Sequence, residues 1–166
     1  MDTSQKTPLQ LNSMDLDPIA QFNCWLQGAE DAQLPQPNAM TLATSNKHNK
    51  PSARIVLLRG VSERGFAFFT NYESRKAQDL SDNPVAALVF CWLPLSRQIR
   101  IEGRVEQLSA DESDRYFAAR PRGHQIEAHA SAQSQVIKDR TCLDKSFKDV
   151  AERFEGQAVP RPLHWG

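Results

Sequence analysis

Cysteine is scarce in this 166-residue sequence, and the few cysteines present form no recognisable group. Cys24, Cys91 and Cys142 stand far apart, and none belongs to a Cys-x-x-Cys pair. An odd number at this spacing argues against a disulfide framework and against a zinc site. We therefore expect a protein of a reducing compartment, the cytoplasm.

Long hydrophobic runs and an excess of either charge are also missing. The longest apolar run, residues 85–93, is too short to cross a bilayer, and residues 1–12 are polar without the apolar centre of a signal peptide. Twenty Lys and Arg balance twenty Asp and Glu. We therefore expect neither a membrane nor a nucleic acid as partner, and any basic site must be local.

The sequence has enough apolar material for one core, since 40% of its 166 residues are hydrophobic. We expect a flexible arm over residues 1–16 and a single domain over residues 17–166. Punctuation by Pro, Gly and capping residues predicts helices from Asp17-Pro18, over 74–82, from Ser109 to before Pro121, and a last one ending at Gly156. Strands are predicted over 39–44, 54–59, 65–71, 85–93 and 98–106.

The predicted strands are of two kinds. Residues 55–58 and 85–93 are apolar without alternation, which is typical of strands covered on both faces. Residues 98–106 alternate, so that Ile99 and Ile101 share one face and Gln98 lies on the other. The covered strands are candidates for a barrel core, and the alternating strand has one face that is wet or lines a site.

Two cations stand at the start of the helix predicted after Ser74. Arg75 and Lys76 lie where a helix carries partial positive charge and unpaired N–H groups, so they are unfavourable there unless an anion sits among them. A phosphate would resolve the conflict. Alternatively, both side chains simply reach into water.

Other basic residues leave the same choice open. Arg54 and Arg59 bracket an apolar strand, either as its edges or as ligands held by a rigid element. Tyr116, Arg120, Arg122 and His124 form a second set that suits a small anion, although Tyr116 could pack on the barrel with the arginines solvated. The four histidines have no metal spacing, and His124 and His129 are expected at the surface. No hydrolase, Walker or Rossmann motif is present.

In order and spacing, a set of short motifs between about Ile19 and Gly166 resembles the pyridoxamine 5'-phosphate oxidase family. The combination is specific although no single motif is. The motifs are Pro37-Asn38-Ala39-Met40, Arg54-Ile55-Val56-Leu57-Leu58-Arg59, Phe69-Thr70-Asn71, Ser74-Arg75-Lys76, Arg97-Gln98-Ile99-Arg100-Ile101-Glu102-Gly103, Tyr116-Phe117, Arg120-Pro121-Arg122 and Gln133-Ser134.

The resemblance implies a mainly β protein with peripheral helices, an FMN-binding split β-barrel that forms a homodimer with FMN at the subunit interface. The residues matching the family's FMN positions are Arg54, Ile55, Val56, Leu57, Leu58, Phe69, Thr70, Ser74, Arg75, Lys76, Gln98, Gln133 and Ser134. Those matching the positions that hold the substrate's phosphate are Arg59, Tyr116, Arg120 and His124. No catalytic residue and no metal is assigned.

The family's reaction passes a hydride from pyridoxamine or pyridoxine 5'-phosphate to the flavin, and O2 then reoxidises the flavin with release of H2O2. We therefore expect an oxidoreductase that makes pyridoxal 5'-phosphate. Two alternatives stay open: an FMN-binding relative with another substrate or no oxidase activity, and a non-enzymatic association module.

The sequence departs from the family pattern at several substrate positions. Arg59 stands where the family usually has Lys and His124 where it usually has Ser, while Glu127 and His129 replace a Gly and a Trp. The sequence also ends at Trp165-Gly166, before the family's Arg-x-His-x-Arg segment. These departures affect substrate binding more than FMN binding, since most FMN positions are retained.

Overall fold

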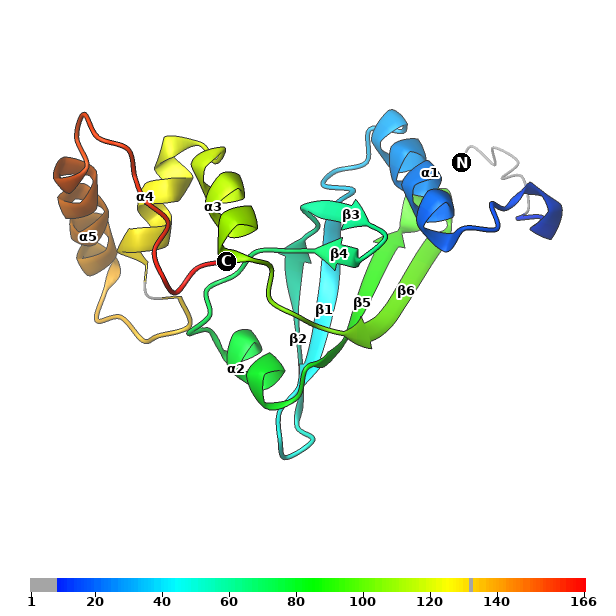
Figure 1. Cartoon of the computed structure of the whole chain (residues 1–166), viewed down its shortest axis with the longest axis horizontal. Coiled ribbons are helices and arrows are strands. Elements are labelled where there is room, and N and C mark those ends of the chain that lie inside the picture. The colour runs from blue at the N-terminus through cyan, green and yellow to red at the C-terminus, as the bar shows by residue number, and fades with distance from the viewer. Residues whose placement is uncertain (1–8, 132) are drawn as a thin grey trace. The chain divides into compact units, whose positions relative to one another are not determined.

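The computed structural model describes residues 9–131 and 133–166 (Figure 1). Half of the predicted arm, residues 1–8, therefore lies outside the described residues, and residues 9–16 include one short 3-10 turn, Leu11–Ser13. The helices are α1 (Pro18–Asp31), α2 (Arg75–Asp82), α3 (Ala110–Ala118), α4 (Arg122–Ala130) and α5 (Arg140–Arg153), with a second 3-10 turn at Leu93–Leu95. The strands are β1 (Ala39–Ser45), β2 (Pro51–Leu57), β3 (Gly60–Ser62), β4 (Gly65–Ala67), β5 (Val85–Trp92) and β6 (Arg97–Arg104).

The strands form two sheets. Four of them make one sheet in the order β2-β1-β5-β6, so β1 and β2 are neighbours joined by the short turn at 46–50. The antiparallel pair β3 and β4 places Gly60 opposite Ala67 and Ser62 opposite Gly65. None of the helices in the described ranges has the length and apolarity needed to cross a membrane.

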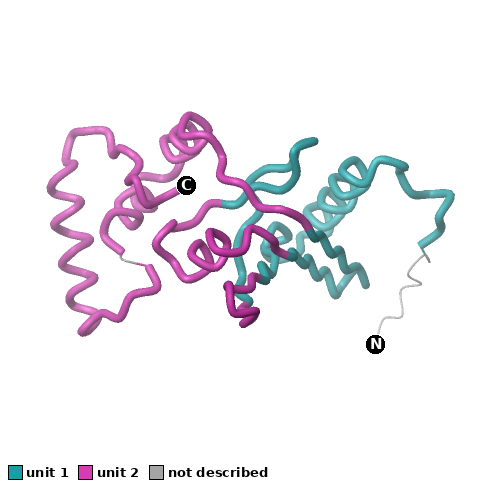
Figure 2. Tube along the Cα trace, turned by 60° about the horizontal axis from the view of Figure 1, so that its bottom comes forward, with its two compact units in different colours: residues 1–43, 53–68, 87–102 teal, residues 44–52, 69–86, 103–166 magenta. Residues whose placement is uncertain are grey.

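The chain separates into two compact units (Figure 2). Unit 1 comprises residues 1–43, 53–68 and 87–102, and unit 2 comprises residues 44–52, 69–86 and 103–166. The prediction of a single domain over 17–166 stays a prediction.

Aromatic rings form the centre of unit 1. Phe22 of α1 makes edge-to-face contacts with Phe66, at a centroid distance of 4.8 Å, and with Phe90, at 5.0 Å. Met40 and Leu42 of β1 are also fully buried, since alternate β1 residues point inward. The buried face of the sheet therefore comes from a period of two, as the strand geometry requires.

Unit 2 has its own core between helices and the last residues of the chain. Its buried cluster consists of Phe117, Ile126, Phe154, Val159 and Trp165. These residues come from α3, α4, the end of α5 and the irregular segment after it, so the segment is part of the core.

Helix starts follow the predicted capping chemistry. The Asp17 carboxylate accepts a hydrogen bond from the Ile19 N–H at 2.9 Å, directly before α1. Ser109 and Glu112 form the predicted capping box of α3. These predictions are confirmed. Ser74 is the residue before α2, but its hydroxyl makes no capping bond and accepts a hydrogen bond from Lys76 instead.

Four predicted strands run past the observed ends, by one residue in β5, two in β2 and β6, and four in β4. The strand predicted over 54–59 is β2, which ends at Leu57 because the Arg59 N–H donates to the Ala67 carbonyl. The strand predicted over 65–71 ends at Ala67. Beyond it the Thr70 N–H donates to the Gly166 carbonyl at 2.7 Å, so this backbone pairs with the far end of the sequence instead.

One further expectation is wrong for the single described chain, and one helix was not predicted. The apolar strands are not covered on both faces, because burial alternates along β5 and Ile55 of β2 is 63% exposed. Helix α4 was not predicted, since its first turn contains Gly123 and its N-cap is Pro121, which gives no capping side chain.

Candidate functional site

A lysine ammonium gathers hydroxyl groups at the start of α2. Lys76 Nζ donates to Thr70 Oγ1 at 2.9 Å and to Ser74 Oγ at 3.1 Å. It also donates to Gln133 Oε1 at 3.3 Å, which brings in a residue from the loop after α4. Four of the predicted FMN residues therefore lie together in unit 2, and we call Thr70, Ser74, Lys76 and Gln133 the α2 cluster.

The chemistry of the α2 cluster fits an anion. A hydroxyl that accepts from an ammonium still has a proton to donate, and the first N–H groups of α2 have no partner within the helix. Ser74 is fully buried, so its position is fixed by the surrounding fold. Together these groups present positive charge and several donors at a helix N-terminus, which is the donor set that a phosphate monoester requires.

The two cations predicted at this place differ in their surroundings. Lys76 is half-buried among the hydroxyls, whereas the Arg75 side chain is exposed. The alternative in which both reach into water therefore holds in this structure for Arg75 alone.

Stacked aromatic rings form a second group in unit 2. The Tyr116 ring lies parallel to Phe69 at a centroid distance of 3.9 Å and an angle of 7°. The Trp165 ring is also parallel to Phe69, at a centroid distance of 5.2 Å and an angle of 5°. The Arg120 guanidinium carbon stands 4.6 Å from the centroid of the Trp165 ring. Two of the predicted substrate residues, Tyr116 and Arg120, thus share contacts with one tryptophan.

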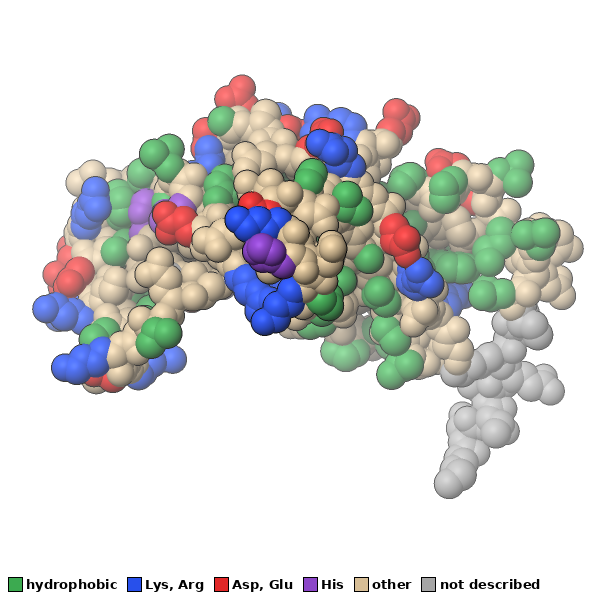
Figure 3. Space-filling view, turned by 90° about the horizontal axis from the view of Figure 1, so that it is seen from below, with side chains coloured by type: hydrophobic (Ala, Val, Ile, Leu, Met, Phe, Trp, Pro, Cys, Tyr) green, Lys and Arg blue, Asp and Glu red, His purple; other side chains and the backbone are tan. Residues whose placement is uncertain are grey.

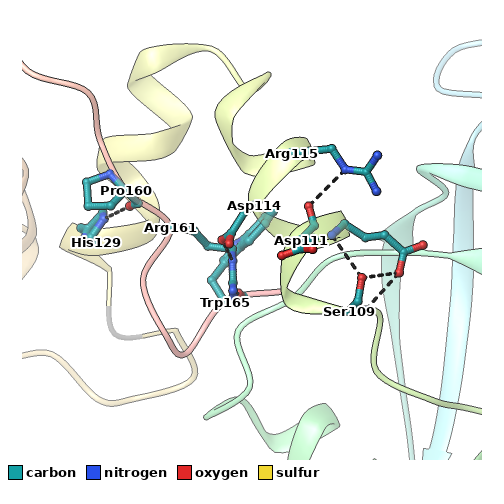
Figure 4. A network of polar contacts seen from close by, with 9 residues as sticks. Ser109, Asp111, Asp114, Arg115, His129, Pro160, Arg161 and Trp165 are labelled. Carbon is teal, nitrogen blue, oxygen red and sulfur yellow. Dashed lines mark hydrogen bonds and ion pairs between the residues drawn. The ribbon is translucent and has the colours of Figure 1, made fainter.

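The residues that hold this tryptophan were missed in the sequence. Asn71 and Trp165 form an isolated antiparallel bridge, and Tyr72 N–H donates to the His164 carbonyl. Arg161 donates to Asp114 of α3 at 2.6 Å and to the Trp165 carbonyl at 2.5 Å (Figure 4). The only signal available was an isolated Trp in a proline-rich segment, which does not predict a partner.

Two basic residues of α4 contact the segment after α5. Arg122 donates to the carbonyls of Gln157 and Phe154, so it joins α4 to that segment. His129 is half-buried and its Nε2 lies 2.7 Å from the Pro160 carbonyl oxygen (Figure 4), so its ring contacts the segment after α5. His124 lies exposed in the first turn of α4.

The other predicted site residues belong to unit 1. Arg54 donates to the Leu42 carbonyl at 3.2 Å, so β2 holds its side chain along β1. Leu58 is buried, Val56 and Leu57 are half-buried, and Gln98 and Arg59 are exposed. Ser134, in unit 2, has a φ of 70°, a left-handed conformation uncommon for serine.

Charge is distributed unevenly over the surface. On the face seen in Figure 3 one group of Lys and Arg side chains lies beside a histidine, and further Lys, Arg and acidic side chains are spread over the rest of that face. This agrees with the expectation that a chain of zero net charge can be basic only locally.

Comparison with known proteins gives consistent results. The family model "Pyridoxamine 5'-phosphate oxidase" matches residues 26–154. A pyridoxine/pyridoxamine 5'-phosphate oxidase of Burkholderia mallei is 53% identical over 161 residues, which are 97% of this chain and 75% of the relative. A protein of the same name from Burkholderia ambifaria is 59% identical over 150 residues, 90% of this chain and 70% of the relative.

Two solved structures resemble the fold. PhzG from Burkholderia lata, in complex with tetrahydrophenazine-1-carboxylic acid, has a TM-score of 0.89 at 26% identity and covers 96% of this chain and 80% of its own. A pyridoxamine 5'-phosphate oxidase-related, FMN binding protein from Nostoc punctiforme has a TM-score of 0.67 at 16% identity, covering 92% and 79%. These likenesses confirm the predicted fold class, the split β-barrel with peripheral helices.

Proposed function

Since this chain belongs to the pyridoxamine 5'-phosphate oxidase family, we propose that it binds FMN and oxidises pyridoxamine and pyridoxine 5'-phosphate to pyridoxal 5'-phosphate, with O2 as electron acceptor and H2O2 as second product. The observation that supports this most is the α2 cluster, in which Lys76 collects Thr70, Ser74 and Gln133. The 53% identity to a relative with this activity in its name supports the choice of substrate.

The α2 cluster is the proposed seat of the FMN phosphate. Lys76 supplies the charge, Thr70 and Ser74 supply hydroxyl donors, and the start of α2 supplies backbone N–H groups. In unit 2 the proposed FMN residues also include Arg75, Phe69 and Ser134. In unit 1 they are residues 54–58 and Gln98. When bound, FMN supplies the hydride acceptor and the reactivity towards O2.

The proposed substrate site consists of Arg59, Tyr116, Arg120 and His124. Arg120 is always charged, and its planar fork suits a phosphate that must be held in one orientation. The Tyr116 hydroxyl can donate a further hydrogen bond to a phosphate oxygen. These residues bind and orient, which is the contribution a protein makes when the redox chemistry belongs to the cofactor.

The proposal includes a homodimer with FMN at the subunit interface and a cytoplasmic location. Ile55 and Val85 are exposed apolar strand residues, 63% and 53%, and a second copy of the chain would account for them. The three cysteines are exposed free thiols, which a reducing compartment preserves. Sedimentation equilibrium of the purified protein tests whether it is a homodimer. Fractionation of cells tests whether it is cytoplasmic.

The test of the function has two steps. The purified protein, reconstituted with FMN and freed of excess, is examined for a bound-flavin spectrum, and H2O2 release is then measured with pyridoxamine 5'-phosphate against unphosphorylated pyridoxamine. We expect a yellow protein that releases peroxide with the phosphorylated compound. Colour without peroxide would contradict the substrate, and failure to bind FMN would contradict the cofactor and favour a non-enzymatic association module.

A second candidate keeps the flavin and changes the substrate to an aromatic carboxylic acid. The structure of PhzG, which resembles this chain with a TM-score of 0.89, holds tetrahydrophenazine-1-carboxylic acid. Arg59, in place of the usual Lys, could also accept a carboxylate in a two-pronged contact. Oxidation of dihydroaromatic carboxylic acids but not of pyridoxamine 5'-phosphate would favour this candidate.

A further inference from the structure

We infer that Trp165 is a positioning residue for the substrate phosphate: its indole ring fixes the Arg120 guanidinium and, through Phe69, the Tyr116 ring. The inference rests on the proposed function, since it assigns Trp165 a role at the Arg120 and Tyr116 site. It adds a residue that the motif comparison did not include. All the contacts that carry it lie within unit 2.

The Arg120 guanidinium lies against two aromatic rings. It follows α3, and its N–H donates to the Phe117 carbonyl, which sets where the side chain begins. Its guanidinium carbon then lies 4.6 Å from the Trp165 centroid and 5.5 Å from that of Phe117. A long flexible side chain placed on an indole face has lost much of its rotamer freedom before any ligand arrives.

The same indole is part of the ring stack that includes Tyr116. Phe69 lies against both rings, 3.9 Å from Tyr116 and 5.2 Å from Trp165, and the angle between Tyr116 and Trp165 is only 10°. The direction of the Tyr116 hydroxyl is therefore set by a stack that includes Trp165. One residue thus constrains the two groups proposed to hold the phosphate.

Trp165 can do this because it is itself fixed. Trp165 is only 9% exposed, and its backbone pairs with that of Asn71. Its carbonyl accepts from Arg161, whose Nε donates to Asp114 of α3, the helix that also carries Tyr116 (Figure 4). The indole and the helix that presents Tyr116 are therefore joined by a short chain of polar contacts.

A tryptophan that merely fills the core would give a different result from one that positions Arg120. Loss of a filler lowers stability, whereas loss of this positioning residue lowers phosphate affinity through Arg120 and Tyr116 and has a smaller effect once Arg120 is removed. A double-mutant cycle measures this difference directly.

The experiment uses the full chain with and without FMN and the probe 4-deoxypyridoxine 5'-phosphate, which keeps the ring and phosphate but has no oxidisable group at C4'. Calorimetry measures probe affinity for the unchanged chain, Trp165→Phe, Trp165→Leu, Arg120→Ala and the double variants. Thermal unfolding without ligand is recorded in parallel. Trp25→Leu is the matched control, since it removes another Trp under an arginine, Arg97, at 5.3 Å.

We expect Trp165→Leu to weaken probe binding about tenfold and Trp165→Phe about threefold, since an indole face attracts a cation best. On the Arg120→Ala background both effects should shrink to the part that acts through Tyr116, and Trp25→Leu should leave probe affinity unchanged. If Trp165→Leu does not fold, the Trp165→Phe cycle alone decides.

The two failures are distinguishable. The proposed substrate site is overturned if the unchanged chain does not bind the probe, or if Arg120→Ala binds the probe as tightly as the unchanged chain does. The inference alone is overturned if Arg120→Ala weakens probe binding but the Trp165 variants do not. It is also overturned if the effects of the Trp165 variants simply add to that of Arg120→Ala.

Discussion

Replacing Lys76 by methionine should selectively weaken binding of the FMN phosphate. Methionine keeps an unbranched apolar stem of similar length and removes the ammonium that bonds Thr70, Ser74 and Gln133 at 2.9, 3.1 and 3.3 Å. Because Lys76 is half-buried among these groups, water cannot fully compensate for the loss of its ammonium group. The change tests the one group around which the α2 cluster is built.

The magnitude follows from the contact that is lost. A hydrogen bond from a charged donor contributes about 1.5–3 kcal/mol, which corresponds to a Kd for FMN raised roughly 10- to 150-fold. Arg75→Met should have a smaller effect, since the Arg75 side chain is exposed and water screens its charge. Riboflavin lacks the phosphate, so its affinity should be unchanged by Lys76→Met.

The assay is titration of flavin fluorescence at fixed ionic strength, with Lys145→Met on the exposed side of α5 as control. Lys76→Met that binds FMN within about twofold of the unchanged chain would refute the assignment of the phosphate. Equal losses for FMN and riboflavin would show damage to the fold and not loss of a phosphate contact.

Three further predictions concern stability. Phe117→Ala, at a residue 1% exposed in the core of unit 2, should lower the free energy of unfolding by about 3–5 kcal/mol in denaturant titration. Thr44→Val should lower it by about 1.5–3 kcal/mol, because the Thr44 hydroxyl donates at 2.8 Å to the buried Asp79 carboxylate; an unchanged midpoint would contradict this. The Thr141 hydroxyl and the Cys142 N–H hold the pKa of Asp139 below its ordinary 3.8, so its cap on α5 should stabilise fully above that value and be lost as pH falls through the lowered pKa. The difference in thermal midpoint between the unchanged chain and Asp139→Ala should therefore close in acid, and a constant difference would argue against it.

Local chemistry made much of the fold predictable. Asp17 before Pro18 and the Ser109–Glu112 pair act within one helical turn, so each helix start could be read from neighbouring residues. The alternation over residues 98–106 likewise predicted β6, because a strand that is wet on one face shows its period directly.

Long-range pairing set the limits. Nothing near Phe69 indicates that the strand predicted over 65–71 should end at Ala67, since the cause is a hydrogen bond from Thr70 to Gly166. Helix α4 lacked a capping side chain and so gave no local signal. Apolar runs such as residues 55–58 predicted burial on both faces, but the sequence does not say whether the same chain or another copy provides the cover.

The family motifs named the four residues of the α2 cluster, but they did not predict the contacts between them. Lys76 and Arg75 were equivalent in the sequence, and only burial distinguishes them. Gln133 could be matched to a motif, whereas its bond to Lys76 depends on the path of the loop after α4. Trp165 belonged to no quoted motif, and its role follows from the ring contacts alone.

The bridge between Asn71 and Trp165 also orders events in time. A ribosome makes Phe69 and Tyr116 long before Trp165, so a nascent chain that has emerged only as far as α4 cannot yet complete the ring stack. Unit 2 must therefore finish folding after Trp165 leaves the exit tunnel, and until then its aromatic side chains stay accessible to chaperones and to neighbouring nascent chains.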